Sequence, residues 1–356
     1  MMNAIESLGY KVYFEDDFAS LTSLIEEKNY SQILILVDRH TNDHCLPVLQ
    51  VAIPDLVNYD IIEVDPGEEN KNIDFCIGVW NTMLDFGADR KALMINLGGG
   101  VVTDMGGFAA STYKRGIDFI QIPTTLLAQV DASVGGKTGI DLGNVKNIIG
   151  TFTQPQAVFI NAKFLETLDD RQLNSGFAEI IKHGLIQDKN LYEQCKSLDV
   201  DHISLEIIHR SVEIKNAVIT TDPTEKGLRK ILNFGHTIGH AVEGYSLIND
   251  SDPLLHGEAI AIGMICEAWL STKHAGLSQE DLADITQTFL ARYPKYTFTA
   301  DQYQDFLDLM KNDKKNEDNK IGFALLKSIG DCTYNIYVEE DDILDSLDYY
   351  LRITAE

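Results

Sequence analysis

The segment that decides the fold is Leu93-Met-Ile-Asn-Leu-Gly-Gly-Gly-Val-Val-Thr-Asp104, where a short apolar run leads into three consecutive glycines. An apolar run of this length, bounded by glycine, predicts a buried β-strand. We expect a helix to begin near Val102. Glycines at such a turn let backbone amides approach a pyrophosphate at the helix N-terminus, where the helix dipole favours negative charge. The G-x-G-x-x-G fingerprint is absent, so a tight turn without a ligand is the alternative.

Similar apolar runs recur through the first half of the chain. They are Ile33–Val37, Ile61–Val64, Phe119–Ile122 and Ala157–Ile160. Their alternation with helical stretches predicts a parallel sheet with crossover helices. From about residue 162 the pattern turns helical, with a small strand pair at Phe323–Leu326 and Tyr334–Val338. A chain of 356 residues is too long for one ordinary core. We therefore expect two domains, an α/β domain with a parallel sheet over 1–161 and a mainly α-helical domain over 162–356.

Two groups of polar residues strengthen the dinucleotide interpretation. Asp38 ends the first strong strand, where a carboxylate can hold a ribose diol. Glu68 and Lys71 follow another strand and place a carboxylate and an ammonium one helical turn apart. These positions favour a cofactor over an unliganded turn.

The stretch Pro123–Asp141, followed by Lys146-Asn147, is rich in small and polar residues that are poor at building a core. We expect it to be a loop that wraps a ligand, with Lys137 and Lys146 as cationic contacts. An ordered loop without a ligand is the alternative.

Two imidazoles and one carboxylate stand in separate polar motifs. Glu179 lies in Gly176–Gly184, His236 in Asn233–His240 and His256 in Leu254–Glu258. This is the ligand set of a catalytic zinc with one open position.

The neighbours of these residues narrow the interpretation. Thr237 replaces the glutamate of H-E-x-x-H, which excludes a close match to a zincin protease, and at most one of His236 and His240 need be a ligand. Lys182 follows Glu179 at i+3 and can face the same pocket; a surface ion pair is the alternative.

The net charge and composition limit which classes of ligand the protein can bind. The chain has 55 acidic and 29 basic residues, a formal net charge of −26, which disfavours nucleic-acid binding. Cations nevertheless gather in or beside the motifs, which points to a small anionic ligand; solvated surface lysines are the alternative for any one of them. They are Arg115, Lys137, Lys146, Lys182, Lys215, Arg229, Lys314 and Lys315.

The expected location follows from what the sequence does not contain. Apolar runs are interrupted before the ~18 residues of a membrane span, and the N-terminus lacks a signal-peptide pattern. The five cysteines form no C-x-x-C pair and indicate reduced thiols of a cytoplasmic protein.

Taken together, these motifs resemble the 3-dehydroquinate synthases of the sugar phosphate cyclase superfamily, from about Asp65 to Gly330. The matching motifs are Gly98–Asp104, Arg115-Gly116, Pro123–Asp141, Lys146–Gly150, Gln154-Pro155, Gly176–Gly184, Asp222–Arg229, Leu232–His240, Leu254–Gly263 and Asp313-Lys-Lys315. The resemblance implies a homodimeric lyase of the shikimate pathway that uses NAD and a divalent metal, zinc before cobalt. It also implies that the domain over 1–161 is a Rossmann-like, NAD-binding domain and that the α-helical domain over 162–356 binds the metal and the substrate. The substrate would be the anionic phosphosugar 3-deoxy-D-arabino-heptulosonate 7-phosphate.

The resemblance also implies residue roles. Glu179, His236 and His256 would hold the metal. Substrate contacts would come from Asp131, Lys137, Asn147, Lys182, Lys215, Arg229, Asn233, His240, one of Lys314 or Lys315, and Arg115 of the neighbouring subunit. Cofactor contacts would come from Asp38, Glu68, Lys71, Gly99, Gly100, Val101, Asp104, Thr124, Thr125, Lys137 and Lys146.

Three rival interpretations stay open at this point. One is another cyclase of the superfamily, making valiolone-type, amino-dehydroquinate or deoxy-inosose products. A second is a metal-dependent polyol dehydrogenase with net NAD turnover. A third is a non-catalytic dinucleotide-binding subunit, which the presence of all three metal-type ligands disfavours.

Overall fold

The computed structural model describes residues 2–143, 145–311 and 321–355; Lys314 and Lys315 lie outside these ranges. The chain divides into two compact units. The first unit comprises Met1–Asp169 and Ser204–Asn216, and the second comprises Asp170–Ile203 and Ala217–Glu356. Helix α8 (Leu205–Thr221) therefore begins in the first unit and ends in the second.

The first unit is built on a seven-stranded sheet with the order β1-β2-β9-β6-β5-β3-β4. All neighbouring pairs are parallel except β1 and β2. The strands are β1 (Ile5–Glu6), β2 (Lys11–Phe14), β3 (Ile33–Asp38), β4 (Asp60–Val64), β5 (Leu93–Gly98), β6 (Asp118–Pro123) and β9 (Ala157–Ile160). The five strands predicted from the apolar runs are thus confirmed, and β1 and β2 are additional.

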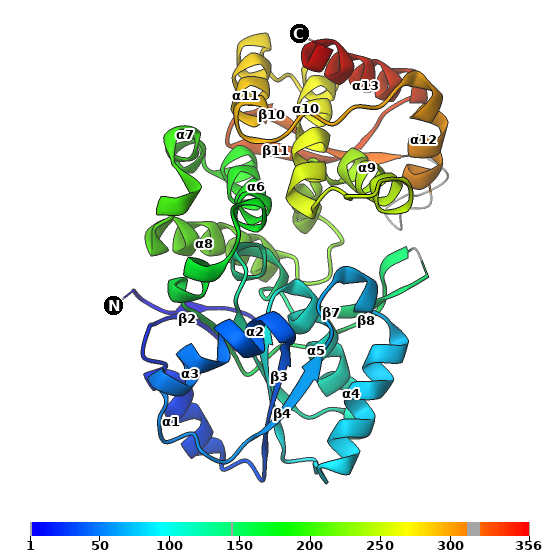
Figure 1. The fold of residues 1–356 in the computed structure, drawn as a ribbon. Helices are drawn as coiled ribbons and strands as arrows, with labels where there is room; N and C mark the ends of the chain where they lie inside the picture. Colours follow the sequence, from blue (N-terminus) through cyan, green and yellow to red (C-terminus); the bar gives the residue numbers. More distant parts are fainter. Residues whose placement is uncertain (1, 144, 312–320, 356) are drawn as a thin grey trace. The chain divides into compact units, whose positions relative to one another are not determined.

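Helices cover both faces of this sheet (Figure 1). On β3, Ile33, Ile35 and Val37 pack in one core, while Leu34 and Leu36 pack in the other, because successive side chains of a strand point to opposite faces. The first core is closed by α1 (Ala19–Lys28) and α3 (Leu46–Ala52), with the short α2 (Arg39–His44) between them, and the second by α4 (Ile73–Asp85) and α5 (Gly100–Thr112). This is the Rossmann-like, doubly wound architecture that the sequence predicts.

The ligand-wrapping loop predicted over Pro123–Asp141 is only partly a loop. It contains one helical turn, Ala128–Ala132, and then strand β7 (Lys137–Leu142), which pairs antiparallel with β8 (Val145–Phe152). Gly139 faces Gly150 across the pair, and a Cβ at Gly150 would lie 2.2 Å from the Thr138 carbonyl oxygen. The small residues therefore serve a close strand pairing that the sequence interpretation did not anticipate.

The second unit is mainly helical (Figure 1). Besides the end of α8 it contains α6 (Asp170–Gln187), α7 (Lys189–Ser197), α9 (His236–Asn249), α10 (His256–His274), α11 (Gln279–Arg292), α12 (Tyr303–Lys311) and α13 (Glu340–Ala355). The predicted strand pair is confirmed as β10 (Gly322–Ser328) and β11 (Asp331–Tyr337), which run antiparallel. Short 3-10 turns complete the described chain: Glu68–Asn70, Tyr113–Arg115, Ala162–Thr167, Val200–His202, Leu228–Asn233 and Ala300–Gln302.

Helix α10 is the centre of the second unit. It is buried along almost its whole length, because it packs against α6, α9, α11 and α13. Glycines set how closely its neighbours approach. A Cβ at Gly263 would lie 1.9 Å from the Gly235 carbonyl oxygen, and a Cβ at Gly257 would lie 2.0 Å from that of Ser175. The absence of a side chain at Gly263 and Gly257 therefore allows α10 to lie in close contact with the start of α9 and with α6.

Two further observations concern the described part of the chain. None of its helices combines the length and hydropathy that crossing a bilayer requires. All five cysteines are free thiols, and all except Cys332 are buried.

Candidate metal centre and cofactor site

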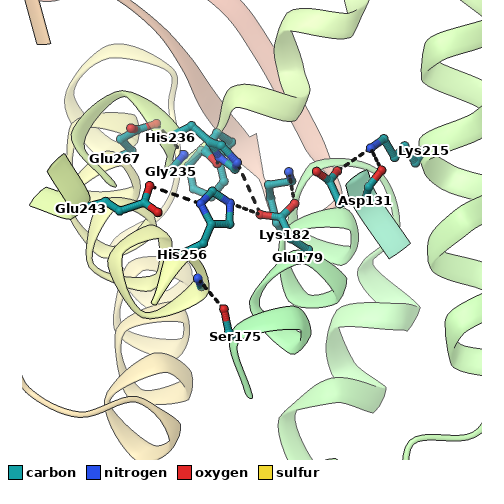
Figure 2. Close-up of polar contacts among 12 residues, drawn as sticks. Asp131, Ser175, Glu179, Lys182, Lys215, Gly235, His236, Glu243, His256 and Glu267 are labelled. Atoms are coloured by element: carbon teal, nitrogen blue, oxygen red, sulfur yellow. Dashed lines mark hydrogen bonds and ion pairs between the residues drawn. The ribbon is translucent and has the colours of Figure 1, made fainter. Parts of the chain in front are cut away.

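Three side chains from three helices of the second unit converge at one point (Figure 2). His236 Nε2 lies 3.4 Å and His256 Nε2 lies 3.7 Å from the same atom, Glu179 Oε1. Glu179 is fully buried. Donors that are each about 2.0–2.2 Å from a tetrahedral ion stand roughly 3.3–3.6 Å apart. The two distances from Glu179 Oε1 to the imidazole nitrogens are therefore close to the donor spacing around a tetrahedral divalent metal.

The other ring nitrogen of each histidine faces an oxygen. His236 Nδ1 lies 3.0 Å from the Phe234 carbonyl oxygen, and His256 Nδ1 lies 3.4 Å from Glu243 Oε2. Because these oxygens accept, Nδ1 carries a proton, and Nε2 is the nitrogen that supplies a lone pair when the ring is neutral. This is the arrangement that orients a metal-ligating histidine.

Acidic neighbours also affect the charge of His256. Burial lowers its pKa, but the nearby carboxylates of Glu243 and Glu179 outweigh burial and raise the pKa to about 9. A site that attracts a proton so strongly is electrostatically suited to a cation.

The first turn of α10 is fixed by its own contacts. Gly257 N donates to Ser175 Oγ at 2.9 Å, and Leu255 N donates to Glu258 Oε2 at 2.8 Å. Arg171 binds both oxygens of Glu258 at 2.8 and 2.9 Å. Together these bonds hold His256 at the start of the helix.

His240 lies one turn beyond His236 on α9 and is exposed. Nitrogens of His236, His240 and His256 lie within 4.8 Å of one another, so a three-imidazole set is geometrically possible. Two observations favour the set with Glu179: the buried carboxylate supplies charge, and both Nε2 atoms point to it. His240 then lies beside the metal set.

Lys182 is buried and donates its Nζ to Glu179 Oε2. The alternative of a surface ion pair is therefore wrong. A lysine with 1 % exposure is tolerated because it is paired with a carboxylate.

A polar turn precedes α9. Arg229 is buried and donates to the Pro223 carbonyl oxygen at 2.9 Å, and Asn233 Nδ2 donates to Glu225 Oε1 at 2.8 Å. Asp222 accepts from the backbone of Gly227 at 2.7 Å, and such backbone bonds outweigh burial and lower its pKa. Glu225 was not predicted as a site residue; its place in the Asp222–Arg229 motif was the available signal.

In the first unit, Gly99 is the N-cap of α5, which begins at Gly100 rather than near Val102. No side chain caps this terminus. A Cβ at Gly99 would lie 2.9 Å from Thr125 Cγ2, and Thr124 N donates to the Gly98 carbonyl oxygen at 3.0 Å. The predicted glycines and both threonines are therefore neighbours. The amides at this end of α5 are suited to a pyrophosphate.

Lys71 joins residues that lie far apart in the sequence. Its Nζ lies 2.6 Å from Asp104 Oδ2 and 2.7 Å from Asn147 Oδ1. Glu68 Oε1 lies 3.9 Å from Lys71 Nζ and 3.7 Å from Lys146 Nζ. Burial lowers the pKa of Lys71, but Asp104 and Glu68 outweigh it and raise the pKa. Asn147, predicted to order the substrate, thus lies among predicted cofactor residues.

The remaining predicted residues of the first unit are more scattered. Asp38 forms a capping box with Thr41 at the start of α2, with Thr41 N donating to Asp38 Oδ1 at 2.8 Å. Lys215 Nζ lies 2.6 Å from Asp131 Oδ1. Lys137 begins β7 and is exposed, and Val101 lies in the first turn of α5.

Arg115 occupies a strained surface turn. It has a φ of 71°, follows Lys114 at 47° and precedes Gly116 at 111°. Two consecutive non-glycine residues in the left-handed region are costly, and such strain often marks a functional site. The turn lines a surface pocket with the neighbouring cations Arg90 and Lys91.

The fold places the chain in a class of enzymes. It matches a 2-deoxy-scyllo-inosose synthase solved with carbaglucose-6-phosphate, NAD+ and Co2+ (TM-score 0.83, 23 % identity, 98 % of this chain and 99 % of that one). It also matches the 2-epi-5-epi-valiolone synthase of Streptomyces hygroscopicus, solved with NAD+ and Zn2+ (TM-score 0.82, 26 % identity, 99 % of each chain). Both solved structures are sugar phosphate cyclases, and this chain shares their fold.

The chain belongs to the 3-dehydroquinate synthase family. The model of the N-terminal part of that family, "3-dehydroquinate synthase N-terminal", matches residues 61–175, and the C-terminal model matches residues 176–316. A 3-dehydroquinate synthase from Parabacteroides distasonis is 41 % identical over 343 residues, which cover 95 % of this chain and 97 % of the relative. The family resemblance inferred from the motifs is confirmed.

Proposed function

We propose that this chain is a lyase that converts 3-deoxy-D-arabino-heptulosonate 7-phosphate to 3-dehydroquinate and phosphate, in the shikimate pathway of aromatic amino acid biosynthesis. The relative from Parabacteroides distasonis supports the reaction, since it carries that name and aligns over nearly both full lengths. The structural observation that carries the proposal is the convergence of His236 and His256 on one oxygen of the buried Glu179. This is an open three-ligand site for a cation.

The reaction balances without net redox change. The C5 hydroxyl becomes a ketone, which acidifies the neighbouring C–H; that proton and the phosphate are lost, and the ketone is then reduced again. Ring opening and an intramolecular aldol addition close the carbocycle. When bound, NAD+ supplies the reversible oxidation by accepting a hydride and returning it.

Glu179, His236 and His256 would hold the divalent metal, zinc before cobalt. When bound, the metal would polarise the reacting hydroxyls and lower their pKa. Lys182, which donates to Glu179, would meet the substrate at its hydroxyl groups.

The domain over 1–161 would bind NAD, and the domain over 162–356 would bind the metal and substrate. Gly99, Gly100, Val101 and Asp104 would contact the pyrophosphate region of NAD, and Thr124, Thr125, Lys137 and Asn147 the nicotinamide side. Asp38, Glu68 and Lys71 would contact the adenosine ribose, with Lys146 nearby. The observed gathering of Glu68, Lys71, Asp104 and Lys146 supports a shared ligand for these four.

The substrate carries a carboxylate and a phosphate, which cations recognise best. Lys215, Arg229, Asn233, His240 and one of Lys314 or Lys315 would bind these groups, and Asp131, paired with Lys215, would orient a hydroxyl.

We further propose a cytoplasmic homodimer. Its free thiols suit a reducing compartment. Arg115, exposed on its strained turn, would reach the phosphate of the neighbouring subunit.

The experiment is phosphate release by the purified protein with NAD+, using the heptulosonate phosphate and several other seven-carbon phosphosugars. We expect release from the heptulosonate without lasting absorbance of NADH. Release from a different phosphosugar only would identify another cyclase. Accumulation of NADH with a polyol would identify a dehydrogenase.

A further inference from the structure

The two histidine-bearing helices hold each other through buried carboxylates. His236 is the first residue of α9 and His256 is the first residue of α10. Glu243 lies on α9 and contacts the histidine of α10, whereas Glu267 lies on α10 and contacts the backbone around the histidine of α9 (Figure 2). Each helix thus supplies one imidazole and one carboxylate, which contacts the other helix's imidazole (Glu243) or the backbone beside it (Glu267).

Glu267 acts on the turn that carries His236. Its Oε2 accepts from Gly235 N at 2.7 Å, and its Oε1 accepts from Ile238 N at 3.1 Å. These amides lie immediately before His236 and two residues after it. Both oxygens of a fully buried carboxylate are therefore engaged by the first turn of one helix.

The start of α9 requires such an external partner. Its N-cap is Gly235, at φ 81°, which has no side chain to accept from the first amides of the helix. Unsatisfied amides at a buried helix N-terminus are costly, and a carboxylate there also meets the positive end of the helix dipole. Glu267 therefore replaces the missing cap and thereby fixes the backbone that carries His236.

Glu243 acts on His256 directly. Its Oε2 lies 3.4 Å from His256 Nδ1, and its side chain is buried. A carboxylate at this nitrogen fixes the ring orientation and makes Nε2 a better donor to a metal.

We propose that Glu243 and Glu267 are positioning residues that set the two imidazoles for the metal before it binds. This inference rests on the metal site in the proposed function. Neither residue was among the ligand candidates suggested by the sequence motifs. Their effect should appear in metal affinity, because a metal that meets oriented ligands has less ordering entropy to overcome.

The test compares the wild type with Glu267→Gln and Glu243→Gln. The amide oxygen of the glutamine at 267 can accept from one backbone amide, but its NH2 group then faces the other. At position 243, glutamine keeps the shape of the side chain but removes its negative charge. Ser271→Ala is the matched control: Ser271 is buried on α10 and bonds to the Glu267 carbonyl oxygen at 2.6 Å and to Leu326 N at 2.9 Å. The control removes buried hydrogen bonds of the same helix without touching either histidine-holding contact.

Zn2+ affinity is measured by competition with a chromophoric chelator, and the visible spectrum of bound Co2+ reports its coordination. We expect each glutamine variant to bind Zn2+ about 10- to 100-fold more weakly. The Co2+ spectrum should change in both, whereas Ser271→Ala should keep the wild-type affinity even if its Tm falls.

The outcomes separate this inference from the function itself. Unchanged Zn2+ affinity in both glutamine variants, or an equal loss in Ser271→Ala, overturns the positioning roles and leaves the metal site standing. A wild-type protein that binds no Zn2+ overturns both. If Glu267→Gln does not fold, the Zn2+ affinity of Glu243→Gln alone tests the positioning role, because this substitution leaves the cap of α9 intact.

Discussion

Lys182 lies three residues beyond Glu179 on α6 and donates its Nζ to the Glu179 carboxylate inside the second unit. The Lys182 ammonium thus contacts Oε2 of Glu179, while the two histidines face Oε1 of the same carboxylate. One carboxylate serves two different partners. This arrangement separates the side of Glu179 that faces the proposed metal site from the side that faces Lys182.

Lys182→Ala should therefore reduce turnover while the metal stays bound. We expect phosphate release to fall by about two orders of magnitude, as when a single oriented donor is lost from an active site. Metal content is measured on the same samples by atomic absorption. Parallel loss of zinc and activity would instead place Lys182 in the metal shell.

Glu179→Ala and His256→Ala should remove both the bound metal and phosphate release, because each deletes one of three ligands. Metal removal should also lower stability. A ligand at about 1,000 times its Kd stabilises the folded state by about 4 kcal/mol, so a chelator should lower the wild-type Tm. The Tm of Glu179→Ala should not respond to Zn2+; full activity in either variant would refute the ligand assignment.

Lys71→Met should destabilise the first unit by about 3 kcal/mol, because it leaves Asp104 with a partly buried charge and no ammonium partner. The double variant Lys71→Met/Asp104→Asn should recover part of that loss, because it removes the second charge as well. Urea unfolding measures stability, and titration with NAD+ measures binding, which we expect to be weaker in both. Equal stability of the single and double variants would show that the pair is not electrostatically coupled.

Arg115→Ala and Lys182→Ala should complement each other if Arg115 acts on the neighbouring subunit. Each variant alone should be nearly inactive. Co-expressed in equal amounts, they should form mixed dimers with one intact site, which gives about a quarter of wild-type activity for random pairing. No activity in the mixture would place Arg115 in its own subunit's site or outside any site.

The first unit was predictable to a large extent from local patterns. The apolar runs at β3 and β5 alternate between two cores, so each requires cover on both faces, and the glycines at 98–100 mark the turn at the strand end. The hairpin β7–β8 was missed because its glycines and polar residues are also typical of loops. Only the pairing of Gly139 with Gly150 shows why they are small.

The sequence indicated which residue types form the candidate site, but it did not indicate which of them contact one another. Glu179, His236 and His256 stand out because histidines and a carboxylate are unusual in these motifs. His240 is an equally good histidine, and nothing in the spacing decides between it and His236.

Residue type and short-range periodicity thus specify the parallel sheet, the glycine turn and a short set of metal donors, since each depends on neighbours within a few positions. Packing decides the rest: which oxygen of Glu179 the imidazoles share, that Lys71 meets Asn147, and that Glu243 and Glu267 support the opposite helix. These contacts depend on how closely α9 and α10 approach at Gly235 and Gly263. A close approach between residues 28 positions apart is a property of the folded chain that no local pattern encodes.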